Sequence, residues 1–309
     1  MSTWHILGAG SLGCLWAARL AAAQHTVHLI LRDHAAIARY QQTPGVGLSD
    51  AQGQHTQHYP VSAQLATEPQ PIDYLLLACK AYDAEAAISQ VAHRLSKDSL
   101  VILLQNGLGS QQAIQNMLPD SRCIAASSTE AAYLTQPFHS VFAGQGQTWL
   151  GDLQQAQQAE PEHLLALCNA AAIPCTWTAQ IELYLWRKLA INCVINPMTV
   201  IYDCQNGGLA DHPQQVNTLC AELEQLLCHA GQPQAAEGLS EQVWTVIEKT
   251  AANSSSMRQD VLNRRRTEIS YITGFACAQS LALECHTPAL HQLHQQLQDI
   301  LQTHGLPTF

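Results

Sequence analysis

The chain has 309 residues, of which 47% are hydrophobic and 12% are charged. This length is enough for one large domain, or for two ordinary ones, with a substantial buried core. The formal net charge is −10 and Arg264–Arg266 is the one basic run, which argues against binding to nucleic acid or to an anionic membrane.

The 11 cysteines are scattered and include no CxxC pair. Several of them fall within apolar runs, where reduced core thiols are expected rather than disulfides or metal ligands. We therefore expect no metal site. The first residues enter a strand pattern without the regions of a signal peptide, and no apolar stretch is long enough to cross a membrane. We expect a cytoplasmic protein that is a monomer or a weak homo-oligomer.

The first half of the chain alternates short apolar runs with helical patterns. The predicted strands are Trp4–Leu7, Val27–Leu31, Tyr74–Cys79, Leu100–Leu104 and Cys123–Ala126. The predicted helices between them are Leu12–Ala23, His34–Tyr40, Asp83–Leu95 and Ser110–Met117. Continuous apolar strands separated by helices indicate a parallel sheet covered on both faces, which is a doubly wound α/β fold of the Rossmann type. Shorter β-like pieces over 129–151 are expected to extend this sheet with antiparallel strands.

Strand signals stop near Ala179, and the rest of the sequence predicts helices only. These helices are expected at Gln180–Asn196, Pro213–Ala230, Ala235–Thr250, about Ser256–Ser280, and Pro288–Thr303. The change predicts two domains, a nucleotide-binding sheet domain over 1–178 and an all-α substrate domain over 179–309.

A G-x-G-x-x-G motif follows the first predicted strand and opens the first helix; its residues are Gly8, Ala9, Gly10, Ser11, Leu12 and Gly13. In this context the motif predicts a dinucleotide-binding loop. The first glycine allows a tight turn, the second lets the backbone approach a pyrophosphate, and the third lets the helix pack closely on the strand. The diphosphate would bind the free N–H groups at the helix N-terminus. A plain glycine turn is the less favoured alternative.

Further polar residues follow the predicted strands. Arg32 and then Asp33 come after the second strand, where an arginine suits the 2′-phosphate of NADPH and an acid suits the ribose of NADH. Because Arg32 comes first, we interpret the cofactor as NADPH, although an exposed loop arginine is an alternative. Lys80 and Asn106 follow two later strands, at the edge where open α/β sheets bind ligands, so both are predicted to line the site.

In the helical half, Lys188, Asn192 and Asn196 recur every four residues, which places them on one stripe of a helix. Their neighbours are apolar, so these side chains need polar partners. A substrate with a carboxylate, a carbonyl and a hydroxyl would supply them. From the spacing alone, a polar seam against another packed element is an equally good interpretation.

A second predicted helix carries four polar residues at four-residue intervals, namely Ser256, Asp260, Arg264 and Glu268. Ser256 lies at the expected start of this helix, so helix capping explains it equally well. Arg264 and Glu268 could form an ordinary surface pair. Spacing does not choose between these interpretations.

Several stretches resemble ketopantoate reductases, and bacterial members most closely. They are Glu182–Thr199, which contains the lysine and asparagine stripe, Ser255–Asp260, Arg266–Ile269, Leu103–Gly109, Leu77–Ala81 and the N-terminal glycine loop. The similarity spans nearly the whole chain. Glu130 stands where we expect another polar residue, and we assign no role to it.

The resemblance implies NADPH-dependent reduction of 2-dehydropantoate to pantoate, on the way to pantothenate and coenzyme A. Lys188 would be the general acid, and Glu268 would orient it or hold the substrate hydroxyl. Asn192, Asn196 and Ser256 would bind the substrate carboxylate and hydroxyls. The resemblance also places Asn106 and Lys80 between cofactor and substrate, and Asn206 where it would close the site.

Two alternatives stay open. The chain could reduce another small 2-keto acid on the same fold, or it could bind NADPH as a sensor without turnover. Retention of Lys188, Asn192, Asn196 and Glu268 argues against a sensor, because a sensor needs no proton donor.

Overall fold

The computed structural model describes residues 2–153 and 160–309. The chain folds into two compact units. The sheet unit comprises Met1–Gln105 and Ser110–Ile181, and the helical unit comprises Asn106–Gly109 and Glu182–Phe309. The short loop Asn106–Gly109 therefore belongs to the helical unit, although sheet-unit residues flank it in the sequence.

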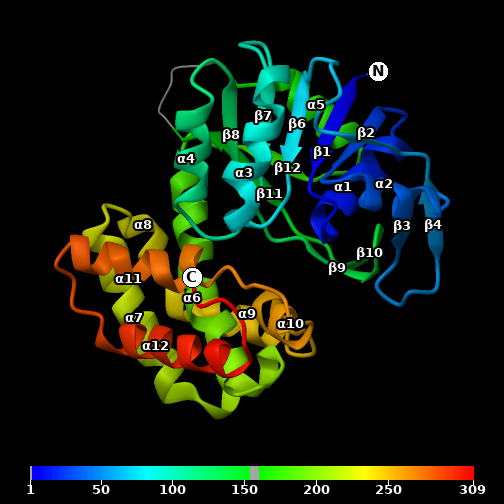
Figure 1. Ribbon diagram of the computed structural model, residues 1–309. Helices are drawn as coiled ribbons and strands as arrows, with labels where there is room; N and C mark the ends of the chain where they lie inside the picture. The colour runs from blue at the N-terminus through cyan, green and yellow to red at the C-terminus, as the bar shows by residue number, and fades with distance from the viewer. Residues whose placement is uncertain (1, 154–159) are drawn as a thin grey trace. The chain divides into compact units, whose positions relative to one another are not determined.

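The sheet unit is built on an eight-stranded sheet in the order β12-β11-β8-β7-β6-β1-β2-β5 (Figure 1). Its strands are β1 (Thr3–Leu7), β2 (Thr26–Leu31), β5 (Ser62–Leu65), β6 (Tyr74–Leu77), β7 (Leu100–Leu103), β8 (Arg122–Ser128), β11 (Thr148–Asp152) and β12 (Cys175–Trp177). Neighbours from β5 to β8 are all parallel, whereas β11 runs antiparallel to β8. All five predicted strands are present, and the order of the parallel strands confirms the doubly wound, Rossmann-type fold.

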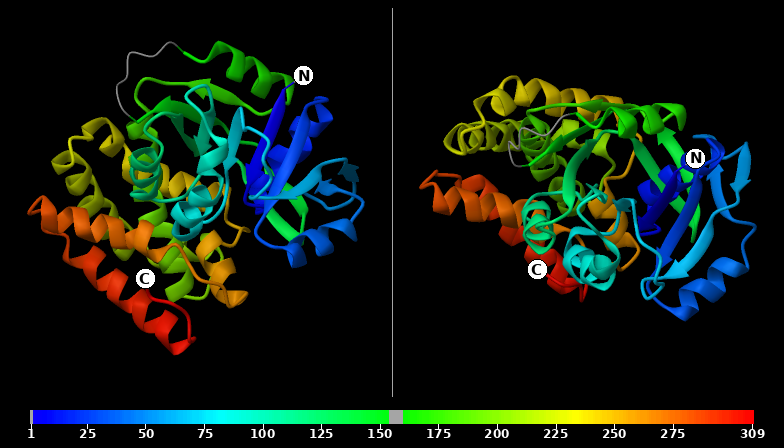
Figure 2. Two further views of the ribbon diagram at one scale, coloured as in Figure 1. Left: turned by 45° about the horizontal axis from the view of Figure 1, so that its top comes forward. Right: turned by 90° about the horizontal axis from the view of Figure 1, so that it is seen from above.

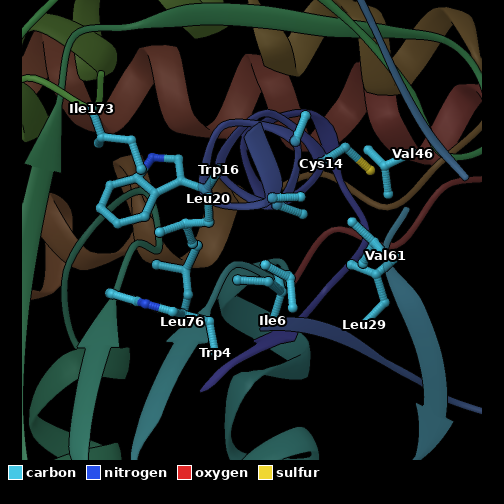
Figure 3. Close-up of a cluster of buried hydrophobic side chains, with 14 of the residues drawn as sticks. Trp4, Ile6, Cys14, Trp16, Leu20, Leu29, Val46, Val61, Leu76 and Ile173 are labelled. Carbon is cyan, nitrogen blue, oxygen red and sulfur yellow. The ribbon is translucent and has the colours of Figure 1, made fainter. Parts of the chain in front are cut away.

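Both faces of this sheet are covered by helices. They are α1 (Ser11–Ala22), α2 (His34–Gln41), α3 (Ala81–Val91), the short η1 (Ala92–Arg94), α4 (Ser110–Met117) and α5 (Glu162–Ala170). Successive strand residues point to opposite faces of the sheet, so β1 contributes side chains to two hydrophobic cores. Trp4 and Ile6 pack with Trp16 of α1 in one core (Figure 3). Leu7 packs in the other core, to which α3 and α4 contribute.

A second sheet of four strands, in the order β4-β3-β10-β9, packs on α1. Its strands are β3 (Val46–Ser49), β4 (Thr56–Tyr59), β9 (Ala131–Gln136) and β10 (His139–Gly144). The prediction that 129–151 extends the main sheet is therefore right only for β11. Because β11 occupies the edge of β8, β9 and β10 pair with each other and with β3 instead. The Ser140 hydroxyl ties β10 to α1 by donating to the carbonyl oxygen of Ser11 at 3.0 Å.

The described part of the helical unit contains helices and connecting loops only. They are α6 (Ile181–Ile201), η2 (Asn206–Asp211), α7 (Pro213–His229), α8 (Pro233–Ala236), α9 (Leu239–Lys249), α10 (Ser256–Leu262), η3 (Ile269–Tyr271), α11 (Thr273–Ala282) and α12 (Pro288–Thr303). Figure 2 shows α12 in red beside α11 in orange, and these two helices are in contact. Among the described helices, none is long and apolar enough to span a membrane.

Two predicted helices are wrong in extent. The expected helix Ser256–Ser280 ends at Leu262 as α10, and a loop and η3 separate it from α11. Arg264 has a φ of +52°, a left-handed conformation that ends a helix. The expected helix Ala235–Thr250 is likewise two helices, because Gly238 with a φ of +64° separates α8 from α9.

Candidate active site

The glycine loop between β1 and α1 has the geometry of a dinucleotide-binding turn. Gly8 has a φ of +118°, and a Cβ atom there would lie 2.4 Å from the backbone nitrogen of Cys79. A Cβ atom on Gly13 would lie 2.1 Å from the carbonyl oxygen of Gly8, so only glycine lets the helix pack this closely. A Cβ atom on Gly10 would meet only the carbonyl oxygen of Ala78, at 3.7 Å. Packing within the protein does not require glycine there, but close approach of a phosphate would.

The N-terminus of α1 is suited to an anion. Gly10 is its N-cap residue, and within the described part of the chain no side chain caps it. The first turn also lacks an acidic residue, and Ala9, Ser11 and Leu12 are partly accessible. The backbone N–H groups of this turn are therefore suited to an anion, and binding of a diphosphate there stays a prediction.

Arg32 and Asp33 occupy the turn between β2 and α2. The Asp33 side chain accepts a hydrogen bond from the backbone N–H of Ala36 at 2.6 Å and so caps α2. This hydrogen bond is the main reason that the pKa of Asp33 lies below its usual value. Its second oxygen accepts from Arg32 Nε at 3.1 Å, while the Arg32 side chain is 81% exposed. The carboxylate is thus engaged within the protein, and the guanidinium faces solvent.

The carboxyl ends of β6 and β7 are held together by Gln105, a residue to which the sequence assigned no role. Its Nε2 donates to the carbonyl oxygen of Leu77 at 2.7 Å, and the side chain is buried. Lys80 follows β6 as the N-cap residue of α3 and is partly buried. A buried glutamine directly after an apolar strand was the signal that could have revealed this link.

Asn106 lies with the helical unit, and it meets Glu268 there. Asn106 Nδ2 donates to Glu268 Oε2 at 3.4 Å, near the long end of the hydrogen-bond range. The loop is fixed two residues later, where the Leu108 N–H donates to the carbonyl oxygen of Tyr271 at 2.9 Å. Gly107 is required between them, because a Cβ atom on it would lie 2.1 Å from that same carbonyl oxygen.

Lys188 lies on α6, where it is partly buried, and Glu268 lies in the loop just before η3. Burial lowers the pKa of Lys188 to about 8, and the nearby negative charge of Glu268 opposes this shift. Glu268 is itself only 4% exposed. A lysine ammonium with a pKa near neutrality can both hold and release a proton at physiological pH, which is what a general acid requires.

The asparagines of the predicted stripe lie on the same helix as the lysine. Asn192 and Asn196 fall one and two turns after Lys188 on α6. Asn192 is partly buried and Asn196 is 6% exposed, between the buried residues Cys193 and Pro197. The stripe thus presents polar groups within an apolar environment.

Ser256 and Asn206 occupy different settings. Ser256 is the first residue of α10 and is exposed, while the preceding Ser255 is the N-cap residue. Asn206 begins η2 and is buried, and its Nδ2 donates to Thr250 Oγ1 at 2.8 Å. This side chain ties η2 to the end of α9, so at least part of its hydrogen bonding is internal to the fold.

The sequence matches two family models, one over each half of the chain. Residues 4–155 match the family model described as ketopantoate reductase PanE/ApbA, and residues 180–301 match its C-terminal counterpart. The chain belongs to the ketopantoate reductase family. The resemblance inferred from the sequence is therefore confirmed.

The chain is similar over nearly its whole length to a curated relative and to solved structures. A 2-dehydropantoate 2-reductase of Vibrio cholerae is 34% identical over 307 residues, which are 96% of this chain and 97% of the relative. The crystal structure of a PanE/ApbA family ketopantoate reductase from Ralstonia eutropha has a TM-score of 0.83 at 25% identity, covering 98% and 99% of the two chains. A D-mandelate dehydrogenase with NADH and anilino(oxo)acetate has a TM-score of 0.90 at 20% identity, with the same coverage, and shares the fold.

Glu130, to which the sequence assigned no role, forms a buried ion pair in this family member. Its Oε1 lies 2.6 Å from Nη1 of Arg19, whose guanidinium also stacks over the Phe142 ring at 4.7 Å. Arg19 and Phe142 border two open hollows, of about 590 and 400 Å³. These hollows lie in the sheet unit, and none of the predicted site residues lines them.

Residues 2–153 and 160–309 contain no group of three or more His, Cys, Asp or Glu side chains that could hold a metal ion.

Proposed function

We propose that this protein reduces 2-dehydropantoate to pantoate with NADPH as the hydride donor. The observation that carries the proposal is Lys188, whose pKa is lowered by burial to about 8 beside Glu268, on a helix that also presents Asn192 and Asn196. Membership of the ketopantoate reductase family and relatives named 2-dehydropantoate 2-reductase support the choice of substrate.

The proton donor is Lys188. NADPH, when bound, supplies the hydride to the carbonyl carbon of the keto acid. Negative charge then develops on the keto oxygen, where the Lys188 ammonium stabilises it and donates a proton to form the hydroxyl. The nearby Glu268 carboxylate favours the charged form of Lys188, so it helps to keep Lys188 protonated at neutral pH.

Substrate binding is assigned to amide and hydroxyl groups. Asn192, Asn196 and Ser256 hold the substrate carboxylate and hydroxyl, and Asn206 completes the binding site. Asn106 lies beside Glu268 and acts at the junction of substrate and nicotinamide. Amide groups suit this task because each one offers both donors and an acceptor to a hydroxy acid.

Cofactor binding is assigned to the sheet unit, within the proposed cofactor domain 1–178, while 179–309 is the proposed substrate domain. The glycine loop binds the diphosphate, Arg32 binds the 2′-phosphate, and Lys80 is assigned to the cofactor on its substrate side. The preference for NADPH over NADH is supported by Asp33, because its carboxylate caps α2 and pairs with Arg32. A carboxylate used in this way is poorly placed to select a ribose hydroxyl, whereas Arg32 is exposed to meet a phosphate.

The proposed setting is the cytoplasm, with the enzyme as a monomer or a weak homo-oligomer and without a nucleic-acid partner. None of the 11 cysteines is in a disulfide, which suits a reducing compartment. The net charge of −10 disfavours nucleic acid.

The test is loss of NADPH absorbance with purified protein and 2-dehydropantoate, with NADH and pyruvate-like keto acids as controls. Rapid loss that requires both NADPH and 2-dehydropantoate supports the proposal. Loss with a different keto acid would keep the mechanism and change the substrate. NADPH binding without oxidation of any substrate would favour a sensor and overturn the proposal.

A further inference from the structure

Helix α6 carries a proline, Pro197, in its interior, two residues before the buried Thr199. Pro197 cannot donate a helical hydrogen bond, and its ring disfavours helical backbone at the preceding residue, Asn196. The helix nevertheless continues to Ile201. The Thr199 hydroxyl donates to the carbonyl oxygen of Asn196, the residue just before the proline, at 2.8 Å.

The same threonine bonds to a second helix. Thr199 Oγ1 lies 2.7 Å from Ser255 Oγ, and both side chains are buried, with Thr199 fully inaccessible. Thr199 has one proton, which it gives to Asn196, so Ser255 is the donor in this contact. Ser255 Oγ in turn accepts from the backbone N–H of Arg258 at 3.0 Å and caps α10.

The result is one continuous chain of hydrogen bonds. It runs from the Arg258 N–H to Ser255, from Ser255 to Thr199, and from Thr199 to the Asn196 carbonyl. One end fixes the backbone of Asn196, and the other fixes the first turn of α10, where Ser256 follows Ser255. Every donor and acceptor in the buried pair has a partner, which is the condition under which a polar network fixes geometry.

We propose that Thr199 and Ser255 are positioning residues that hold Asn196 and Ser256 at the spacing the substrate requires. This inference rests on the proposed function, in which Asn196 and Ser256 bind the substrate. Neither Thr199 nor Ser255 needs to touch the substrate. Their hydroxyls act through the backbone of α6 and the start of α10.

A second link between the same two helices supplies the matched control. The Arg258 guanidinium lies 2.9 Å from Asp203 Oδ1, just after the end of α6. The Asp203 side chain is 77% exposed, so this ion pair is expected to contribute little. Asp203→Asn breaks the exposed link and leaves the buried hydroxyl pair in place.

The experiment compares Thr199→Val, Thr199→Ser, Ser255→Ala and Asp203→Asn by steady-state kinetics. Thr199→Val keeps the shape of the side chain and removes the hydroxyl. We expect it to raise the KM for 2-dehydropantoate about tenfold or more, with a smaller change in kcat and an unchanged KM for NADPH. Thr199→Ser should restore the wild-type KM, and Asp203→Asn should leave it unchanged.

Comparing the changes in KM and in kcat distinguishes a positioning role from partial unfolding of the variant. A partly unfolded preparation loses kcat in proportion to its active fraction and keeps its KM. Ser255→Ala should also raise the KM, and the double variant Thr199→Val/Ser255→Ala should raise it by much less than the product of the two single effects. This coupling keeps the inference testable if one variant folds poorly.

Two results would overturn the inference, and they are distinguishable. An active wild-type enzyme, with an unchanged KM in well-folded Thr199→Val and Ser255→Ala, would refute the positioning role alone. Wild-type protein that does not turn over 2-dehydropantoate would remove the proposed function and this inference with it.

Discussion

Asn106 Nδ2 donates a hydrogen bond to Glu268 Oε2 at 3.4 Å, although the two residues are 162 positions apart in the sequence. Both belong to the helical unit. The contact places an amide donor on the carboxylate that also tunes Lys188. The loop that carries Asn106 is therefore part of the proposed proton-donor site.

This contact depends on Gly107, which has a φ of +78° and lies against the carbonyl oxygen of Tyr271. Gly107→Ala should displace the loop, break the Asn106–Glu268 hydrogen bond and lower kcat/KM about 10- to 100-fold, the usual worth of a hydrogen bond to a charged group. Gly231→Ala is the matched control, because Gly231 also has a positive φ, +72°, but a Cβ atom there meets nothing within 4 Å. Equal kinetics in the two variants would show that the loop position does not matter.

The pH dependence of kcat/KM should report the ionisation of Lys188. A general acid must be protonated, so kcat/KM should be level below the Lys188 pKa of about 8 and fall as the pH rises through it. Glu268 raises that pKa, so Glu268→Gln should move the fall to lower pH. If kcat/KM falls at the same pH in Glu268→Gln as in the wild type, the electrostatic role of Glu268 is contradicted.

Cofactor preference should depend on Arg32 and not on Asp33. Arg32→Ala removes the donor proposed for the 2′-phosphate and should raise the KM for NADPH about 10- to 100-fold while leaving that for NADH nearly unchanged. Asp33→Ala removes the cap of α2 and should lower the free energy of unfolding, without a switch in cofactor. The assignment fails if Arg32→Ala affects both cofactors equally.

Acid stability should depend on His5, which is buried in the sheet unit. Burial, together with the nearby charges of His28 and Arg94, lowers the pKa of His5 to about 4. His5 Nε2 accepts from Arg94 Nη2 at 3.3 Å, and the His5 ring stacks on His28 at 5.0 Å, so the neutral form fits the fold.

The sign of this effect follows from proton binding. Between pH 6.5 and about 4 the unfolded chain binds a proton at His5 that the folded protein does not. The free energy of unfolding should therefore be undiminished above pH 6.5 and fall by up to about 3 kcal/mol as the pH drops to about 4. Urea unfolding across this pH range measures how steeply the free energy of unfolding falls with pH. This slope should be smaller in His5→Gln. An identical slope in both proteins would exclude His5 as the source.

The sheet domain was largely predictable because its strands are short, continuous apolar runs between helices. The runs at Trp4–Leu7 and Leu100–Leu104 could be recognised because both of their faces are buried. The second sheet was missed because β4, with the sequence Thr56-Gln57-His58-Tyr59, is mostly exposed and has no apolar pattern. β3 also contains a glycine, which weakens a strand signal.

For the polar residues of the helical half, the spacing argument held only where those residues share one helix. The spacing of Lys188, Asn192 and Asn196 gave their common stripe, because a helix repeats almost every four residues. The same argument failed for Glu268, because α10 ends at Leu262 and Glu268 lies in the loop before η3. Left-handed backbone at a non-glycine residue such as Arg264 leaves no clear mark in the sequence.

The most direct test of the account is the turnover of Lys188→Ala with NADPH and 2-dehydropantoate, measured beside the wild-type enzyme. NADPH binding, followed by fluorescence titration, shows whether the cofactor site is intact in the variant. We predict unchanged NADPH binding and a loss of kcat on the order of 10²–10⁴, the usual contribution of a general acid. Near-normal kcat in Lys188→Ala, with 2-dehydropantoate reduced as in the wild type, would contradict the central claim that Lys188 donates the proton.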